Sequence, residues 1–246
     1  LVDAINITDG ASANCHMSSV AAASVLVAHG FEAVCQVGCR DRNRIALQGD
    51  VLGAAALGVR NVLCLTGDDV GQGDHPDAKP VFDLDAVNLL ATLSGMTSRG
   101  EYASGRRLDA QVPLFLGATA NPFVPPHAER IANLQRKIDA GARFIQTQFC
   151  FDVALLETFM NAFVRRGLHR QARLIVGVGM LPSARGLRWM AEHVPGVHVP
   201  EAVTRRIAAA ADQRAEGVRW CVETIQALQG IDGVAGVHLM GHRNEA

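Results

Sequence analysis

Polar residues follow several apolar, β-rich segments of this 246-residue chain, at the points where strands would end. The segment NVLCL precedes Thr66, Gly67 and Asp68, and another such segment carries Gln148 near its end. A carboxylate at a strand end can orient or protonate a nitrogen heterocycle, and an amide can bind the edge of a pterin, flavin or purine. The alternatives are purely structural roles: Asp68 as a turn residue, and Gln148 as a buried amide that hydrogen-bonds nearby backbone groups.

A long polar stretch separates Asp68 from the next helical pattern. Residues 66–82 include His75 and Lys79 but hardly any apolar side chain, whereas most connections take about 4–6 residues. No HxH or HxxxH spacing occurs within this stretch, so no metal site is predicted there. The stretch is interpreted as a polar cover over a cofactor, with a plain solvated loop as the competing interpretation.

Lys137 lies in a helical pattern whose buried stripe is marked by Ile131, Leu134 and Ile138. It stands beside that stripe rather than on it. The residue pattern by itself favours a Lys on a solvated helix face, but a Lys at a helix edge can also pair with a phosphate.

The segments that carry these residues alternate between strand and helix patterns. Strands are expected at 3–8, 32–38, 60–66, 113–119, 143–149, 173–179 and 233–240. Helices are expected at 18–29, 42–57, 83–94, 127–140, 152–166 and 183–193 and over the long stretch 201–229, with Asp83 and Asp152 placed as N-caps. This alternation predicts parallel strands joined by right-handed crossovers, and the apolar strands indicate a sheet covered on both faces.

Two α/β architectures fit this order, a doubly wound sheet and a (β/α)8 TIM barrel. No GxGxxG follows the first strand, which weakens the dinucleotide-binding option. Polar residues recur instead at strand carboxyl ends, which form the active-site rim of a barrel. Because about seven strands are found and a barrel has eight, the first β/α unit is expected to be missing. Residues 1–246 are thus expected to be a single barrel catalytic domain that is incomplete at its N-terminus.

Composition narrows the class of protein. The formal net charge is −1 and 49% of residues are hydrophobic, which does not suggest nucleic-acid binding and provides no membrane-spanning segment. The six cysteines show no CxxC and are interpreted as reduced core thiols of a cytoplasmic protein.

Six segments, in order along nearly the whole chain, resemble the methylenetetrahydrofolate reductase family, in its bacterial, flavin-dependent form. They include DAINITDG, CRDRNRIALQGDVLGAAALGVRNVLCLTGD, GDHPDAKPVFDLDAVNLL, LGATANPF, LQRKIDAGARFIQTQFCFD and VGMLPSARG. The resemblance implies a barrel with FAD across its rim and a ping-pong oxidoreductase reaction at one site. NADH or NADPH reduces the flavin. Hydride from the reduced flavin then converts the bridging methylene group of 5,10-methylenetetrahydrofolate into the methyl group of 5-methyltetrahydrofolate. This is a reaction of the oxidoreductase class that acts on CH–NH groups, and a step of one-carbon metabolism and methionine biosynthesis.

The resemblance also assigns residues. Asp68 matches an Asp that contacts the folate pterin and modulates the flavin, and Gln148 matches a Gln that hydrogen-bonds the pterin. Lys137 matches a Lys that reaches the FAD phosphates, which reverses the interpretation from its helix position alone. The other matched flavin-contacting positions are Thr8, Gln36, Thr66, Gly67, Phe82, Asp83 and Asn121, with Phe82 and Asp83 beside the adenosine-diphosphate part.

Three departures from the family pattern stand out. Gln36 stands where some members have a His, and Thr66 stands where some members have an Arg. The family's general acid is a Glu on the first barrel strand, which no segment here matches, so the acid is expected upstream of Leu1. Alternatives are a folate- or flavin-binding barrel without reductase activity, and an enzyme of folate-linked methyl transfer or demethylation. The family tends to self-associate, so a homo-oligomer is also an expectation.

Overall fold

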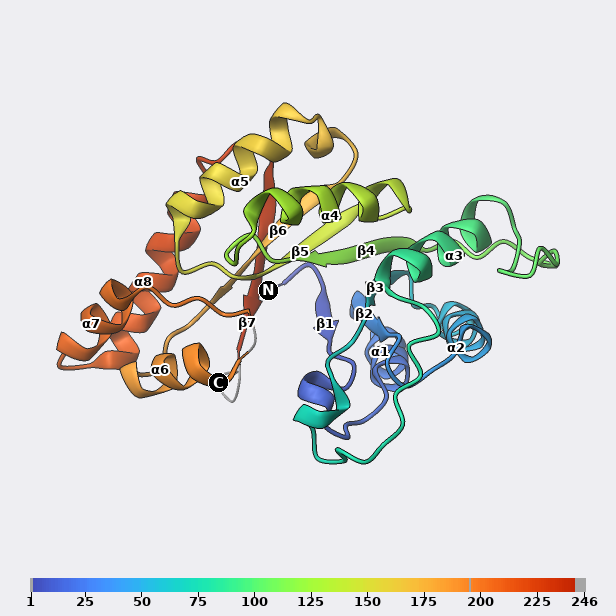
Figure 1. Ribbon diagram of the computed structural model, residues 1–246, viewed down its shortest axis with the longest axis horizontal. Coiled ribbons are helices and arrows are strands. Elements are labelled where there is room, and N and C mark those ends of the chain that lie inside the picture. The colour runs from blue at the N-terminus through green and yellow to red at the C-terminus, as the bar shows by residue number, and fades with distance from the viewer. Residues whose placement is uncertain (1, 195, 242–246) are drawn as a thin grey trace. The chain divides into compact units, whose positions relative to one another are not determined.

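The computed structural model describes residues 2–194 and 196–241 and alternates strands with helices (Figure 1). The strands are β1 (Ile5–Ile7), β2 (Ala33–Gly38), β3 (Asn61–Leu65), β4 (Phe115–Ala120), β5 (Phe144–Phe149), β6 (Arg173–Gly179) and β7 (Val234–Met240). The helices are α1 (Ser19–Ala28), α2 (Arg44–Ala56), α3 (Ala86–Ser98), α4 (His127–Asp139), α5 (Val153–Arg165), α6 (Ala184–His193), α7 (Glu201–Ala209) and α8 (Gln213–Leu228). Short 3-10 turns follow three of the elements: η1 (Ala11–Ala13), η2 (Val70–Gln72) and η3 (Leu168–Arg170).

The strands lie in the sheet in their chain order, β1 to β7. The pairings β1–β2, β2–β3, β3–β4, β5–β6 and β6–β7 are all parallel. The predicted α/β class and parallel sheet are therefore confirmed. The described residues supply seven strands, and the eight-stranded barrel remains a prediction.

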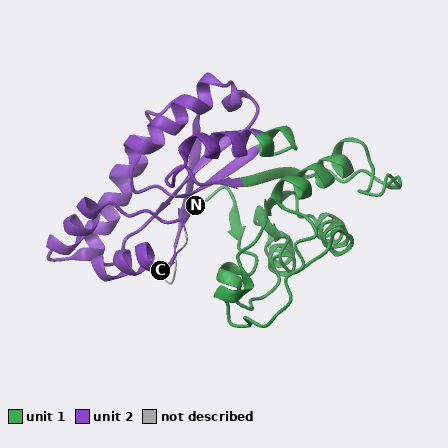
Figure 2. Ribbon diagram, viewed as in Figure 1, with its two compact units in different colours: residues 1–118, 136–143 green, residues 119–135, 144–246 purple. Residues whose placement is uncertain are grey.

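The chain divides into two compact units (Figure 2). Unit 1 comprises residues 1–118 and 136–143, and unit 2 comprises residues 119–135 and 144–246. Within unit 1, α1 packs on β1 and β2, and α3 packs on β3. Within unit 2, α8 packs on β6 and on α5. Each unit has its own set of fully buried apolar side chains, including Leu63 and Leu89 in unit 1 and Leu156 and Phe163 in unit 2.

Local sequence explains where the helices begin, with one correction. Asp152 caps α5 as predicted, since its carboxylate accepts a hydrogen bond from the Leu155 N–H at 2.9 Å. The prediction that Asp83 caps α3 is wrong, because Asp85 accepts from the Asn88 N–H at 2.8 Å instead.

The long helical stretch predicted over 201–229 is broken into two helices. α7 ends at Ala209, and α8 begins after Asp212, whose carboxylate accepts from the Ala215 N–H at 2.9 Å. The break was not recognisable from the sequence, because the apolar period continues across it. An Asp that caps a new helix also cannot be told by type from an Asp on a solvated helix face.

The six cysteines are all free. Five are buried, as predicted for core thiols, and burial raises the pKa of Cys35 to about 11 and that of Cys150 to about 12. These thiols stay protonated at neutral pH and are poor nucleophiles. Cys15 is exposed, so the prediction of a core position is wrong for this one. None of the helices among the described residues combines the length and apolar character needed to cross a bilayer.

Candidate active site at the strand ends of unit 1

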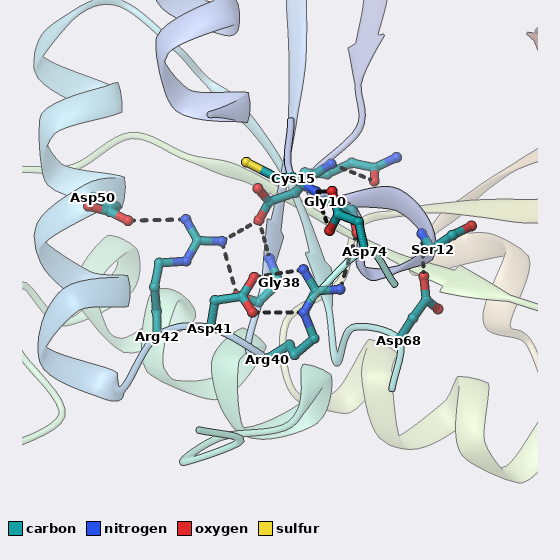
Figure 3. Close-up of polar contacts among 12 residues, drawn as sticks. Gly10, Ser12, Cys15, Gly38, Arg40, Asp41, Arg42, Asp50, Asp68 and Asp74 are labelled. Atoms are coloured by element: carbon teal, nitrogen blue, oxygen red, sulfur yellow. Dashed lines mark hydrogen bonds and ion pairs between the residues drawn. The ribbon is translucent and has the colours of Figure 1, made fainter. Parts of the chain in front are cut away.

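Three loops meet at the carboxyl ends of β1, β2 and β3 in unit 1 (Figure 3). Parallel strands bring these ends to one edge of the sheet. The loop after β1 contains η1, and the long loop after β3 contains η2. These two turns contact each other, so the residues between β3 and α3 are packed against the first loop of the chain.

Asp68 is exposed in the first part of the long loop. Its Oδ2 accepts a hydrogen bond from the backbone N–H of Ser12 at 3.0 Å, a residue 56 positions earlier (Figure 3). The local turn is made by its neighbour Asp69, which accepts from the Gly71 N–H at 2.9 Å. Asp68 therefore joins two loops and leaves the turn-capping task to Asp69.

Thr66 and Gly67 shape the chain just before Asp68. The Thr66 hydroxyl accepts from the Ala86 N–H at 3.1 Å and so ties the strand end to the first residue of α3. Gly67 has a φ of +102°, and a Cβ there would lie 2.8 Å from the Cβ of Arg40. Only glycine combines this φ with this close approach.

A buried arginine lies beneath these loops. Arg40 is 7% exposed, and its Nε and Nη2 each donate to the Asp41 carboxylate at 2.7 Å. Its Nη1 donates to the Gly10 carbonyl at 3.1 Å. The hydrogen bonds from Arg40 lower the pKa of Asp41, although burial opposes this, so the pair is ionised at neutral pH.

A second arginine braces the same corner. Arg42 forms an ion pair with Asp9 and another with Asp50 at 3.1 Å, and it donates to the Gly38 carbonyl at 3.0 Å (Figure 3). Asp9 also accepts from the Gly38 N–H at 2.8 Å. This cluster fixes the ends of β1 and β2 relative to α2.

The two residues predicted to contact a flavin from β1 and β2 differ in availability. Thr8 follows β1 directly and is exposed. Gln36 is half-buried on β2, where its Nε2 donates to Asn6 Oδ1 at 3.2 Å and its Oε1 accepts from the Asp9 N–H at 3.4 Å. Gln36 thus connects β1 with β2 through its own amide.

Phe82 and Asp83 lie at the end of the long loop. Phe82 is 39% exposed and has a φ of +40°, a left-handed conformation that is strained for a bulky side chain. Asp83 accepts three hydrogen bonds from Arg44, one from its backbone N–H and two from its guanidinium, each at 2.8 Å. The preceding Val81 donates its N–H to the Arg40 carbonyl at 2.7 Å. These contacts anchor the segment to the start of α2.

The Arg44–Asp83 pair predicts a pH dependence. Side-chain hydrogen bonds from Arg44 lower the pKa of Asp83 to about 2, against about 3.9 for a free Asp. A lowered pKa in the folded state means that the contribution to stability is fully present above pH ~4 and is lost as the pH falls towards ~2. Thermal unfolding of wild-type protein and Asp83→Asn should show a stability gap that is constant above pH ~4.5 and narrows below pH ~4. A gap that stays the same down to pH ~2 would rule this pair out as the cause.

Lys137 lies half-buried near the end of α4. Its charge acts on the thiol of Cys64 on β3, where burial raises the pKa and the lysine opposes that rise. The ammonium therefore lies close enough to the sheet of unit 1 to influence a strand residue. This placement differs from a side chain that extends freely into solvent.

Two predicted site residues belong to unit 2. Gln148 on β5 is half-buried, and its Oε1 accepts from the Phe149 N–H at 3.0 Å, where β5 and β6 shift register. Asn121 follows β4 directly. Its Nδ2 donates to the Gly196 carbonyl at 2.8 Å, and its Oδ1 accepts from the Phe123 N–H at 3.1 Å. Asn121 therefore braces its own loop with both ends of its amide.

The structure thus places seven of the predicted site residues of unit 1 on or after its strands β1 to β3, whereas Lys137, also of unit 1, lies on α4. Gln148 and Asn121 belong to unit 2. The seven residues of unit 1 that lie on or after the strands are Thr8, Gln36, Thr66, Gly67, Asp68, Phe82 and Asp83. Among residues 2–194 and 196–241, no group of three or more His, Cys, Asp or Glu is arranged to hold a metal ion.

Comparison with known proteins decides the family. A model of the family described as methylenetetrahydrofolate reductase matches residues 2–246. The chain belongs to the methylenetetrahydrofolate reductase family. Its resemblance in sequence to this family, inferred above from six segments, is thereby confirmed.

One curated relative and one solved structure show how far the similarity extends. A 5,10-methylenetetrahydrofolate reductase from Pectobacterium carotovorum subsp. carotovorum is 27% identical over 179 residues, covering 71% of this chain and 52% of the relative. The chain therefore spans about half the length of that curated relative. A solved structure described as an uncharacterized protein from Clostridium thermocellum that binds two copies of 5-methyl-5,6,7,8-tetrahydrofolic acid has a TM-score of 0.56 at 11% identity. That alignment covers 86% of this chain and 67% of the other, and it supports the fold alone.

In this member of the reductase family, sequence reasoning did not predict the inward contacts of the buried Arg40 and the half-buried Arg42. The signal was visible as the charged run CRDRN directly after a strand. Such a run usually marks a solvated loop, and only the structure shows that Arg40 and Arg42 turn inward to Gly10, Asp9 and Asp50.

Proposed function

We propose that the chain is a flavin-dependent reductase that converts 5,10-methylenetetrahydrofolate into 5-methyltetrahydrofolate, with NADH or NADPH as the reductant in a ping-pong cycle. The observation that carries this proposal is the family match over residues 2–246. The exposed carboxylate of Asp68 at the carboxyl end of β3 agrees with it, because that edge is where α/β proteins of this kind place their chemistry.

The residues of unit 1 fit FAD in their chemistry. FAD, when bound, supplies the hydride transfer between the nicotinamide and the folate. Lys137 offers a cation for the phosphates, and the exposed ring of Phe82 offers an apolar surface for the adenosine part. The strain at Phe82 supports such a role, since strained backbone is concentrated at ligand sites. Thr8 and the Thr66 to Asp68 segment remain exposed for the ring system.

Three assigned positions fit FAD less directly. The amides of Gln36 and Asn121 already hold partners within their own units. Asp83 is engaged by Arg44 through three hydrogen bonds. We assign these residues to shaping the cofactor site and retain contact with FAD as the expectation from the family.

For the folate, the proposed contacts are Asp68 and Gln148. Asp68 accepts one backbone hydrogen bond from Ser12, and a carboxylate has about four acceptor positions, which leaves capacity for the N–H groups of a pterin. The Gln148 amide keeps its NH₂ donors, because only its oxygen is used by the Phe149 N–H. Asp68 would orient the pterin and stabilise positive charge that develops on it.

The rest of the proposal follows from the family. The seven strands of residues 1–246 would belong to one (β/α)8 barrel domain. The general acid would come from outside the segments matched here. A cytoplasmic location and self-association are further parts of the proposal.

A direct test is to purify the full-length protein and record its visible spectrum and its NADH and NADPH oxidation, with menadione as the acceptor. A flavin spectrum and nicotinamide oxidation that depends on FAD are expected. A protein that neither retains nor responds to FAD would contradict a flavin enzyme and would favour a binding module.

Lys137→Ala is expected to weaken FAD binding about tenfold or more, because a charge-assisted hydrogen bond contributes roughly 1.5–3 kcal/mol. Arg136→Ala is the matched control, since Arg136 is an exposed cation on the same turn of α4. The dissociation constant is measured by titrating apoprotein with FAD and following flavin fluorescence. Equal, small effects of both variants on the dissociation constant would show that Lys137 is only a residue of a solvated helix face.

A further inference from the structure

The donor that holds Asp68 lies in an unusual backbone. Ser12 has a φ of +54° and Ala13 a φ of +58°, so two consecutive non-glycine residues adopt the left-handed conformation. Each such residue is strained by roughly 1 kcal/mol or more and persists only where the surroundings hold it. The N–H of Ser12 is thus aimed at Asp68 by contacts elsewhere in the loop.

Two contacts hold the part of that loop that follows Ser12. Asp74 accepts from the Cys15 N–H through both carboxylate oxygens at 3.1 Å. Gly73 approaches Ala13 so closely that a Cβ would lie 2.0 Å from the Ala13 carbonyl oxygen. Both come from the loop after β3, which also carries Asp68.

Arg40 holds the part of the loop that precedes Ser12. Its Nη1 donates to the carbonyl of Gly10, two residues before Ser12 (Figure 3). Its backbone carbonyl accepts from Val81, and its Cβ lies against Gly67, next to Asp68. Arg40 therefore contacts the loop that contains the donor and the loop that contains the acceptor.

The guanidinium of Arg40 is held in a fixed orientation. Two parallel hydrogen bonds to Asp41 fix its plane and leave Nη1 directed at Gly10. The hydrogen bonds that Arg40 donates to Asp41 raise the pKa of Arg40, and the charge of Asp68 contributes in the same direction. Asp68 is therefore near enough to interact electrostatically with a cation that is 7% exposed.

We propose that Arg40 is a positioning residue for Asp68. It fixes the Gly10 carbonyl, and thereby the strained turn that aims the Ser12 N–H at Asp68, so that the folate meets a carboxylate already oriented before binding. The proposal rests on the proposed function, in which Asp68 contacts the folate. A well-oriented charged group needs no reorganisation during the reaction, which is why its position affects the rate.

The first arm of the test needs no ligand. The amide proton shift of Ser12 is measured by NMR in isotope-labelled full-length protein, with and without Asp68→Asn, in the wild-type and Arg40→Met backgrounds. In the wild-type background the Asp68→Asn change should move the Ser12 signal, because a charged acceptor is replaced by a neutral one. In the Arg40→Met background the same change should leave it in place. A response of equal size in both backgrounds would overturn the proposal.

The second arm is a double-mutant cycle on the rate of the folate half-reaction. Arg40→Met should lower this rate about tenfold and add no further loss to Asp68→Asn, because residues that act through one group are not additive. Losses that multiply would overturn the proposal. If wild-type protein reduces no folate, the proposed function fails, and the Ser12 shifts still decide the role of Arg40.

Two further variants keep the result interpretable. Arg42→Lys is the matched control, because Arg42 is an arginine of the same loop that contacts Asp9 and Asp50 but not Gly10. It should leave the response of Ser12 to Asp68→Asn intact.

If Arg40→Met does not fold, Arg40→Lys replaces it, since an ammonium keeps the charge but lacks the rigid planar group that binds Asp41 and Gly10 together. Arg40→Lys should reduce the Ser12 response, and an undiminished response would count against the proposal.

Discussion

Replacing Asp68 by Asn is expected to slow the folate half-reaction about 10²-fold while FAD stays bound, because the change removes the charge and little else. The Asn oxygen can still accept the Ser12 N–H that Asp68 now holds at 3.0 Å, so the loop should keep its place. The half-reaction with NADH or NADPH should be far less affected. Stopped-flow measurement of each half-reaction separates the two effects.

Asp69→Asn is the matched control for that experiment. Asp69 is the adjacent carboxylate, and its oxygen accepts from the Gly71 N–H at 2.9 Å within its own turn. The control removes the same charge one residue away, so it tests for a general electrostatic effect. Equal losses for both variants, or an unchanged folate rate in Asp68→Asn, would mean that Asp68 has no specific role.

The largest effect on stability is expected from Gly217→Ala in α8. A Cβ at this position would lie 1.8 Å from the carbonyl oxygen of Leu181 and 2.7 Å from its carbonyl carbon. Alanine is favoured over glycine in a helix by up to ~1 kcal/mol. Overpacking against a backbone that cannot rotate away costs more, about 1–3 kcal/mol or above. The net change in the free energy of unfolding should therefore be a loss of about 2 kcal/mol.

Gly49→Ala in α2 is expected to change the free energy of unfolding in the opposite direction. Gly49 is exposed, and a Cβ there would meet no atom within 4 Å. Without a clash, the helix preference alone acts, and a gain of about 0.5–1 kcal/mol is expected. Urea unfolding of both variants, compared at equal slope, measures the two changes. A gain in both variants would show that α8 moves away from Leu181 at little cost.

The order of elements was predictable from sequence because it depends on local periods. All seven strands lie within a few residues of the expected ranges, and Asp152 caps α5 as its position suggested. Asp68 at a strand end was also predictable, since a polar residue after an apolar run marks such an end. These features involve residues close to one another along the chain.

Features that depend on distant partners were not predictable. Asp83 and Asp85 are equivalent as N-caps by sequence, and the difference is that Arg44, 39 residues away, takes Asp83. The inward turn of Arg40 depends on Gly10, 30 residues earlier. Cys15 is exposed, and its backbone N–H is bound by Asp74, 59 residues away. Single-sequence reasoning has no access to such pairings.

The most direct test of the proposed function is an anaerobic mixing experiment. The full-length protein with FAD is reduced with NADH or NADPH, separated from the nicotinamide, and mixed with 5,10-methylenetetrahydrofolate while flavin absorbance and folate products are followed. Return of the oxidised flavin spectrum together with an equal amount of 5-methyltetrahydrofolate is the predicted result. A flavin that stays reduced in the presence of the folate, with no 5-methyltetrahydrofolate formed, would contradict it.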